Sequence, residues 1–268
     1  MSASVNTLND LCLSETAIDD LNVITSSAVT NSKILSLPQL IIPGGTLEGL
    51  KWLALILMTL AHVDKYIFHQ TLPFAFELSR ITLPLFCFVL AYNLARPDSK
   101  ESGRYLRTVK RLALFGLIAC IFFIPLSGQL KGCFPATGFL KGAYPLNIMF
   151  MLFVAASIFY LMDSGGRLKT TAAIFLFVVG GLFVEFWWFG LAVCYFSWLY
   201  CKSPSFLRLT LLIIAVALLY LVNRNIWALA ALPIIFLATK VNLNIPRCKY
   251  IFYVYYPAHL AVILMIKG

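Results

Sequence analysis

Long, uninterrupted apolar runs are the feature that most constrains what this chain can fold into. They cover about residues 49–68, 76–95, 110–127, 145–162, 171–200, 205–222, 226–239 and 250–266. Roughly 20 apolar residues span the hydrocarbon core of a bilayer as a helix, and only helices or closed barrels satisfy their backbone hydrogen bonds there. Because the runs do not alternate apolar with polar residues, they favour helices over a barrel. The sequence therefore predicts an all-α, polytopic integral membrane protein.

The composition excludes a large soluble domain. Hydrophobic residues make up 61% of the chain and charged residues only 12%, whereas ordinary globular domains have about 45–50% and about 25%. A soluble protein this apolar lacks the polar groups to cover its surface. The net charge of +10 comes from short segments between apolar runs, as membrane topology requires. We therefore expect the lipid bilayer, and no nucleic acid, as a partner.

The run 171–200 decides the number of spans. It contains Gly180, Gly181 and Glu185 followed by an aromatic cluster, so it forms either one long kinked helix or two short helices around a turn. The two-helix interpretation gives nine spans with a cytoplasmic N-terminus. It also places more of the 21 Lys and Arg residues on the cytoplasmic side, which the positive-inside rule favours. The sequence thus predicts about nine transmembrane helices.

Two regions are expected along the chain. Residues 1–47 form a polar, mobile tail with a short interfacial segment, because 1–33 is rich in Ser, Thr and Asn, and because prolines interrupt 34–46. Residues 48–268 form the transmembrane domain. The seven cysteines include no CxxC pair, so neither a disulfide framework nor a metal site is expected.

Two histidines lie inside predicted spans, His62 in the first and His259 in the last. Polar groups are costly in a membrane and are functional candidates there, and a histidine suits proton transfer. Lys51 precedes His62 by 11 residues, which places both on one helix face about 16.5 Å apart. The alternative is a packed histidine and a lysine that extends to the membrane surface.

Other polar groups form a short set of candidates. Glu77 and Arg80 begin the second span at a spacing that lets them pair, and Pro84 is expected to kink it. Arg107 and Arg111 belong to a basic stretch that is either a topology signal or a site for a cytoplasmic polyanion. The remaining candidates are Asn147, Glu185 and Tyr256. Without a metal motif, P-loop or nucleophile elbow, these features fit a membrane transferase and a proton-coupled transporter alike.

Several segments occur in an order that resembles the TraX family, which includes the acetylase of conjugative F-type pilin. The resembling segments are Lys51 to His62, Glu77 to Arg80 with Leu83 to Phe86, Tyr105 to Arg111, Asn147 to Phe150, Phe189-Gly190 and Phe252 to Leu260. The resemblance covers about residues 48–266. The basic residue and histidine of the first segment also resemble a wider superfamily of membrane acyltransferases. Family members often carry Asp directly before this histidine, and here the residue is Ala61.

The resemblance implies an acetyl-CoA-dependent N-acetyltransferase of the bacterial inner (cytoplasmic) membrane. Its acceptor would be the N-terminal amine of a pilin subunit, with other pilus-assembly membrane proteins as further partners. His62 would be the general base, assisted by His259 as a second proton carrier or thioester-orienting group, with Glu185 in the same catalytic set. The remaining roles would be CoA-phosphate binding by Lys51, Arg107 and Arg111, and substrate or oxyanion binding by Glu77, Arg80, Asn147 and Tyr256.

Two other functions remain open from the sequence. A membrane O-acyltransferase would acetylate a glycan and leave the pilin amine free. A transporter or pilus-assembly scaffold would consume no acetyl-CoA, and a scaffold would tolerate loss of either histidine. Transporters commonly contain internal repeats, and the sequence shows no convincing one, which counts mildly against transport.

Overall fold

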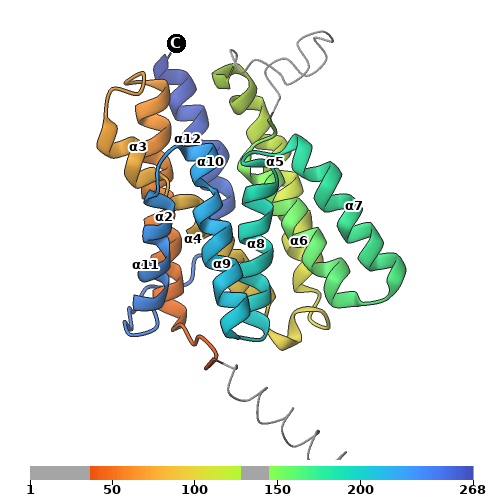
Figure 1. Cartoon of the computed structure of the whole chain (residues 1–268). Helices are drawn as coiled ribbons and strands as arrows, with labels where there is room; N and C mark the ends of the chain where they lie inside the picture. Colours follow the sequence, from red (N-terminus) through yellow and green to blue (C-terminus); the bar gives the residue numbers. More distant parts are fainter. Residues whose placement is uncertain (1–36, 128–144, 268) are drawn as a thin grey trace, which may run out of the picture.

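The fold is a bundle of helices that run roughly along one common direction (Figure 1). The computed structural model describes residues 37–127 and 145–267. The helices of the first half are α2 (Gly44–Tyr66), α3 (Pro73–Ser79), α4 (Thr82–Leu94), the 3-10 turn η1 (Pro97–Ser99) and α5 (Arg104–Ser127). Those of the second half are α6 (Ile148–Ser164), α7 (Arg167–Phe183), α8 (Trp187–Lys202), α9 (Phe206–Leu218), α10 (Tyr220–Asn223), η2 (Trp227–Ala230), α11 (Ala231–Leu237) and α12 (Ile251–Lys267). The predicted all-α class is confirmed for these residues.

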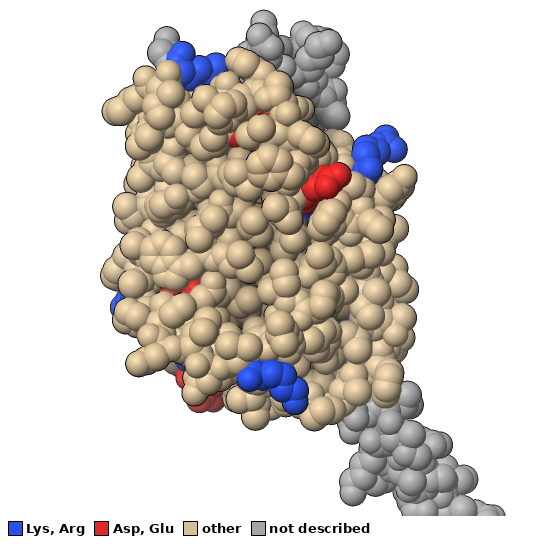
Figure 2. Space-filling model, turned by 90° about the vertical axis from the view of Figure 1, so that its left-hand side faces the viewer, with Lys and Arg blue, Asp and Glu red and all other residues tan. Residues whose placement is uncertain are grey.

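Within residues 37–127 and 145–267, four segments are long and apolar enough to cross a membrane. They are Gly44–Tyr66, Pro73–Leu94, Arg104–Leu126 and Phe206–Asn223. Shorter apolar helices occupy Ile148–Ser164, Trp227–Leu237 and Ile251–Lys267. Figure 2 shows the corresponding surface, a broad area almost free of charge with Lys and Arg gathered toward its two ends. A bilayer accommodates a surface of this kind, whereas the count of nine spans and the orientation remain predictions.

The run 171–200 is two helices, as the positive charges favoured. Helix α7 ends at Phe183 and α8 begins at Trp187, and the two pack side by side. Gly181 allows this packing, because a Cβ there would overlap the ring of Trp188. The indole Nε1 of Trp188 donates to the carbonyl of Val178 at 3.0 Å, which ties the two helices together near the turn.

The second predicted span is distorted one turn before Pro84, in accord with the expected kink. Helix α3 ends at Ser79 and α4 begins at Thr82. A proline ring clashes with the carbonyl four residues earlier, which here belongs to Arg80. Arg80 and Ile81 keep helical backbone angles, but their amides bond to carbonyls three residues back, those of Glu77 and Leu78.

The basic end of the bundle is the end at which α2 begins; it also holds the α4–α5, α6–α7, α8–α9 and α11–α12 connections (Figure 1). The opposite end holds the α2–α3 loop, the α7–α8 turn and the end of α12 (Figure 1). At the basic end, the connection after α11 packs on the first turn of α2. There the hydroxyl of Thr46 donates to the carbonyl of Val241 at 2.7 Å and accepts from the amide of Leu243 at 3.0 Å. Helix α2 thus starts at Gly44, earlier than predicted, and 37–43 precede it without helix. The predicted mobile tail falls mostly outside the described residues.

The core lies around α4, most of whose side chains are buried. This helix packs mainly on α8 and also contacts α2 and α6. Helix α12 packs mainly on α5 and also on α2. The contact between α2 and α12 brings the first and last predicted spans together, although they are separated by most of the chain.

Candidate active site

The two predicted membrane histidines are in contact. The Nδ1 atom of His62 on α2 lies 2.7 Å from the Nε2 atom of His259 on α12. Their rings stack at a centroid distance of 5.0 Å and an angle of 15°. His259 is buried, with 7% of its surface exposed, and Tyr256 lies beside both rings. The sequence identified both histidines, and the packing of α2 on α12 joins them.

The hydrogen bonds determine where the protons of a neutral pair lie. The Nδ1 atom of His259 lies 3.0 Å from the carbonyl oxygen of Tyr255, and a carbonyl only accepts, so this nitrogen carries the proton. The Nε2 atom of His259 is then the acceptor for the Nδ1–H of His62. That arrangement leaves the Nε2 atom of His62 unprotonated. His62 is therefore held in the tautomer that a general base requires.

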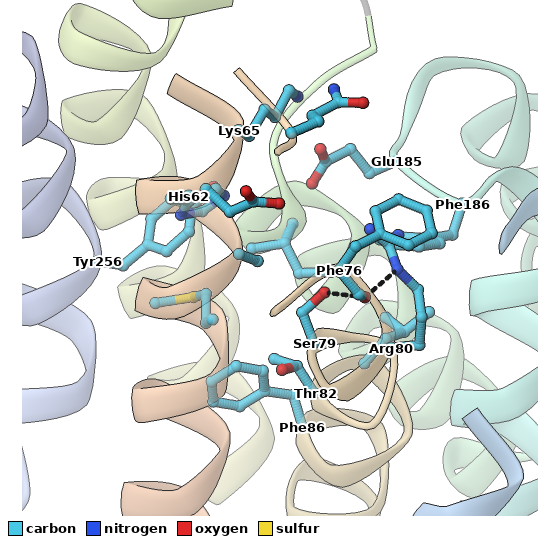
Figure 3. A pocket seen from close by; sticks show the side chains of 16 residues that line it. His62, Lys65, Phe76, Ser79, Arg80, Thr82, Phe86, Glu185, Phe186 and Tyr256 are labelled. Carbon is cyan, nitrogen blue, oxygen red and sulfur yellow. Dashed lines mark hydrogen bonds between the residues drawn. The ribbon is translucent and has the colours of Figure 1, made fainter. Parts of the chain in front are cut away.

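His62 lines a cavity of about 280 Å³ near the opposite end of the bundle. Figure 3 shows His62 and Tyr256 on one side of this histidine cavity and Phe76, Arg80 and Phe186 on the other. The other lining residues are Met58, Ala61, Asp64, Lys65, Gln70, Ser79, Thr82, Leu83, Phe86, Ile148 and Glu185. Ala61, directly before His62 in the chain, thus also faces this cavity.

Glu185 is placed in the cavity wall by the turn between α7 and α8. Leu146 and Val184 form an isolated β-bridge, in which the amide of Glu185 donates to the carbonyl of Leu146 at 3.0 Å. The next residue, Phe186, has a φ of 61°, a left-handed conformation that is strained for a bulky side chain. This geometry directs the Glu185 carboxyl toward Lys65 (Figure 3).

The Glu185 carboxyl lies in a site of low water access. Desolvation there raises its pKa above the ordinary value of 4.5, while the charges of Lys65 and Arg80 and the amide of Ile148 act in the opposite direction. The carboxyl therefore retains its proton to a higher pH than a solvated glutamate. A titratable group perturbed in this way, in a cavity that a histidine also lines, is typical of a functional site.

Arg80 lies in the cavity, but its predicted partner does not. Its guanidinium lies 4.0 Å from the ring centroid of Phe76, and its Nε and Nη1 atoms donate to the Phe76 carbonyl at 3.1 Å and to Asn223 Oδ1 at 3.3 Å. Glu77 makes no described ion pair with Arg80 and lines neither described cavity. The pairing that their spacing allows is thus not among the described ion pairs.

Asn147 has a structural position that the sequence did not indicate. It caps α6, accepting from the amide of Met149 at 3.0 Å, and its Nδ2 donates to the Gly116 carbonyl at 3.1 Å and to Cys120 Sγ at 3.4 Å. Its exposed fraction is 0%, and it lines neither described cavity. Its amide donors are thus committed to packing, and the structure does not bring them to His62.

Thr82 and Asp64 are cavity residues that the sequence reading missed. The hydroxyl of Thr82 is buried and has no hydrogen-bond partner among the described residues, so it is available to a ligand. Asp64 does not orient His62; its Oδ1 accepts from the amide of Leu72 at 3.0 Å and holds the loop between α2 and α3. In the sequence, the only signal for either residue is a polar side chain near a predicted span.

A second, basic cavity of about 700 Å³ lies toward the basic end of the bundle. Six of its lining residues are cationic: Lys51, Arg104, Arg107, Arg111, Arg247 and Lys249. The sequence predicted three of these as one site. The others were counted as topology signals, because nothing in the sequence shows that 247–249 approaches the start of α5. The residues of the predicted polyanion site thus line one cavity, and their binding of a polyanion stays a prediction.

Two of the predicted cations have partners in the cavity wall. The Nζ atom of Lys51 lies 2.5 Å from Oε1 of Glu48 and 5.0 Å from the ring centroid of Phe252. The Nη2 atom of Arg111 donates to the hydroxyl of Tyr250 at 3.4 Å, and its guanidinium lies over that ring. These contacts orient both side chains. Arg107 has no ion pair among the described residues.

The described residues contain no group of three or more His, Cys, Asp or Glu that could hold a metal ion. The described cysteines are free.

These features define an all-helical membrane protein, within the described residues, with a histidine pair at a small cavity near one end and a large basic cavity toward the other. The chain belongs to the TraX family, because it matches the TraX protein family over residues 46–267. This family is associated with the processing of F-type pilin. Neither the curated proteins nor the solved structures contain a match to the chain.

Proposed function

We propose that this protein is an N-acetyltransferase of the bacterial inner membrane that moves an acetyl group from acetyl-CoA to the N-terminal amine of a pilin subunit. The observation that carries the proposal is the His62–His259 pair, in which the free Nε2 atom belongs to His62, a residue that lines a cavity. Membership of the TraX family supports pilin as the acceptor.

The basic cavity supports acetyl-CoA as the donor. The phosphates of CoA carry several negative charges, and Arg and Lys side chains bind phosphate by charge-assisted hydrogen bonds. Six cations line a cavity of about 700 Å³, which suits the charge and bulk of the nucleotide end. Lys51 lies on α2, the helix that also carries His62, and Arg107 lies on α5, which packs on α12. Phosphates bound here would therefore leave the thioester directed along the bundle.

The reaction uses His62 as the base. As the acceptor amine attacks the thioester carbonyl, its proton passes to Nε2 of His62, a C–N bond forms and, on collapse of the tetrahedral intermediate, the C–S bond breaks. CoA leaves as a thiolate and takes up the proton from His62. His259 stabilises the positive charge on His62 by accepting its Nδ1–H, and the Tyr255 carbonyl holds His259 in place.

The negative charge on the carbonyl oxygen would be stabilised by Arg80 and Thr82. Both line the histidine cavity, and the Thr82 hydroxyl lacks another described partner. Glu185 lies across the same cavity and, when ionised, attracts the ammonium form of the acceptor. Asn147 has no part in this scheme, because its amide is committed to Gly116 and Cys120.

Intact-mass spectrometry of the partner pilin tests the proposal. Pilin from cells with the wild-type protein should carry one acetyl group on its N-terminal peptide, and pilin from the deletion strain or from a His62→Ala strain should not. His69→Ala is the matched control, because His69 lies in the α2–α3 loop and lines neither described cavity.

Two results would contradict the proposal. An unmodified pilin together with acetylated glycan would identify an O-acyltransferase. An unmodified pilin with no consumption of acetyl-CoA in purified membranes would identify a transporter or scaffold.

A further inference from the structure

One residue separates the two cavities. Among the described residues, Phe86 alone lines both the histidine cavity and the basic cavity. It lies on α4, and its ring is half-buried. In Figure 3 its ring lies at the end of the histidine cavity farthest from Lys65 and Glu185.

The cavities lie end to end along the bundle. On α12, Phe252 and Tyr253 line the basic cavity, and Tyr256, one turn later, lines the histidine cavity. On α4 the order is reversed, because this helix runs the opposite way: Leu83 lines the histidine cavity and Leu90 the basic cavity. Phe86 lies between these two leucines, on the same helix face.

The spacing requires a connection between the cavities if one donor molecule is to reach both. Lys51 in the basic cavity and His62 in the histidine cavity are separated by 11 residues of α2, or about 16.5 Å along the helix axis. A phosphate bound near Lys51 cannot also lie at His62. The long, flexible arm between the phosphates and the sulfur of CoA would have to pass the side chain of Phe86.

We propose that the ring of Phe86 is a partition between the two cavities and that the thioester end of acyl-CoA passes beside it to reach His62. We also propose that this ring limits the transferred group to short acyl chains. This inference rests on the proposed acetyltransferase function. The residues next to Phe86 along α4 are apolar, as the uncharged thioester and acyl chain require. The histidine cavity of about 280 Å³ must hold both the acyl group and the acceptor amine, so a longer chain would have to fold back against the ring of Phe86.

The test is a competition between acetyl-CoA and hexanoyl-CoA in membranes that contain the full chain and its pilin. Acyl groups on the pilin N-terminus are measured by mass, and released CoA thiol is measured in parallel with a free peptide amine as acceptor. We expect Phe86→Ala to shift the hexanoyl-to-acetyl ratio upward by roughly 10–100-fold, as the opening of an apolar pocket does. Phe86→Leu should give a smaller shift in the same direction.

Two controls separate this effect from general loosening. Leu90 lines the basic cavity alone, so Leu90→Ala should leave the ratio at the wild-type value. Phe175 on α7 is 67% exposed and lines neither described cavity, so Phe175→Ala should change neither the ratio nor the rate. Because Phe86→Leu keeps an apolar side chain on α4, it decides the question if Phe86→Ala fails to fold in size-exclusion chromatography.

The outcomes distinguish the two proposals. A wild-type ratio in both Phe86 variants, with acetyl transfer intact, overturns the partition and leaves the acetyltransferase standing. If the wild-type protein releases CoA in the presence of the free peptide but leaves pilin unmodified, the proposal that pilin is the acceptor is overturned. The ratio of CoA released from the two thioesters then still tests whether Phe86 is the partition. A wild-type protein that releases no CoA from either thioester overturns both.

Discussion

The Nδ1 atom of His62 lies 2.7 Å from the Nε2 atom of His259, although 197 positions of sequence separate the two residues. This contact supplies the partner that orients His62. The residue directly before His62 is Ala61, and Asp64 is committed to the Leu72 amide. The orienting group is therefore a neutral imidazole, which the Tyr255 carbonyl holds in place.

The first prediction concerns this pair. His62→Ala removes the base and should lower the acetylation rate by about 10²–10⁴-fold. His259→Ala should cause a smaller loss, and His259→Gln, whose amide oxygen can accept from His62, should recover part of it. The measurement is initial-rate mass spectrometry of pilin peptides. Equal activity of the alanine and glutamine variants of His259 would show that it does not position His62.

The second prediction concerns the basic cavity. Arg107→Ala should raise the KM for acetyl-CoA by roughly 10–100-fold, because hydrogen bonds to charged groups contribute about 1.5–3 kcal/mol, while kcat changes little. The difference should shrink at high salt, which screens accessible charges. Arg167→Ala is the control, because Arg167 lies at the basic end but lines neither described cavity. Similar KM values for the two variants would argue against CoA binding there.

The third prediction concerns the pH dependence of stability. Because the pKa of Glu185 is raised in the folded protein, folding favours its protonated form. This contribution is fully present below the ordinary pKa of 4.5 and is lost as pH rises through the raised pKa. Glutamine loses no proton, so the melting temperature of Glu185→Gln relative to wild type should rise with pH in this window. It is measured by thermal unfolding in detergent.

The control for this measurement is Glu77→Gln. Glu77 is on α3 near the same end of the bundle and lines neither described cavity. Its melting temperature should follow wild type at every pH. A difference between Glu185→Gln and wild type that stays constant with pH would rule out a titrating Glu185.

The fourth prediction compares two adjacent glycines at the start of α2. A Cβ on Gly45 would overlap the backbone carbonyl of Leu243, whereas a Cβ on Gly44 meets nothing within 4 Å. Gly45→Ala should therefore lower the free energy of unfolding by about 1–3 kcal/mol, and Gly44→Ala should be neutral or slightly stabilising. Denaturant unfolding in detergent measures both. Equal stability of the two variants would show that the connection 241–245 does not pack on α2.

The sequence by itself determined the all-α class, the two-helix form of 171–200 and the two membrane histidines, because apolar runs, charge bias and costly polar groups are local signals. Only the tertiary structure decided that His62 meets His259, that Arg247 and Lys249 join Arg107 in one cavity, and that Glu77 and Asn147 lie outside both described cavities. These relationships depend on which helices pack together and on where a helix breaks. Such choices follow from side-chain packing between segments far apart in the chain, which no local pattern records.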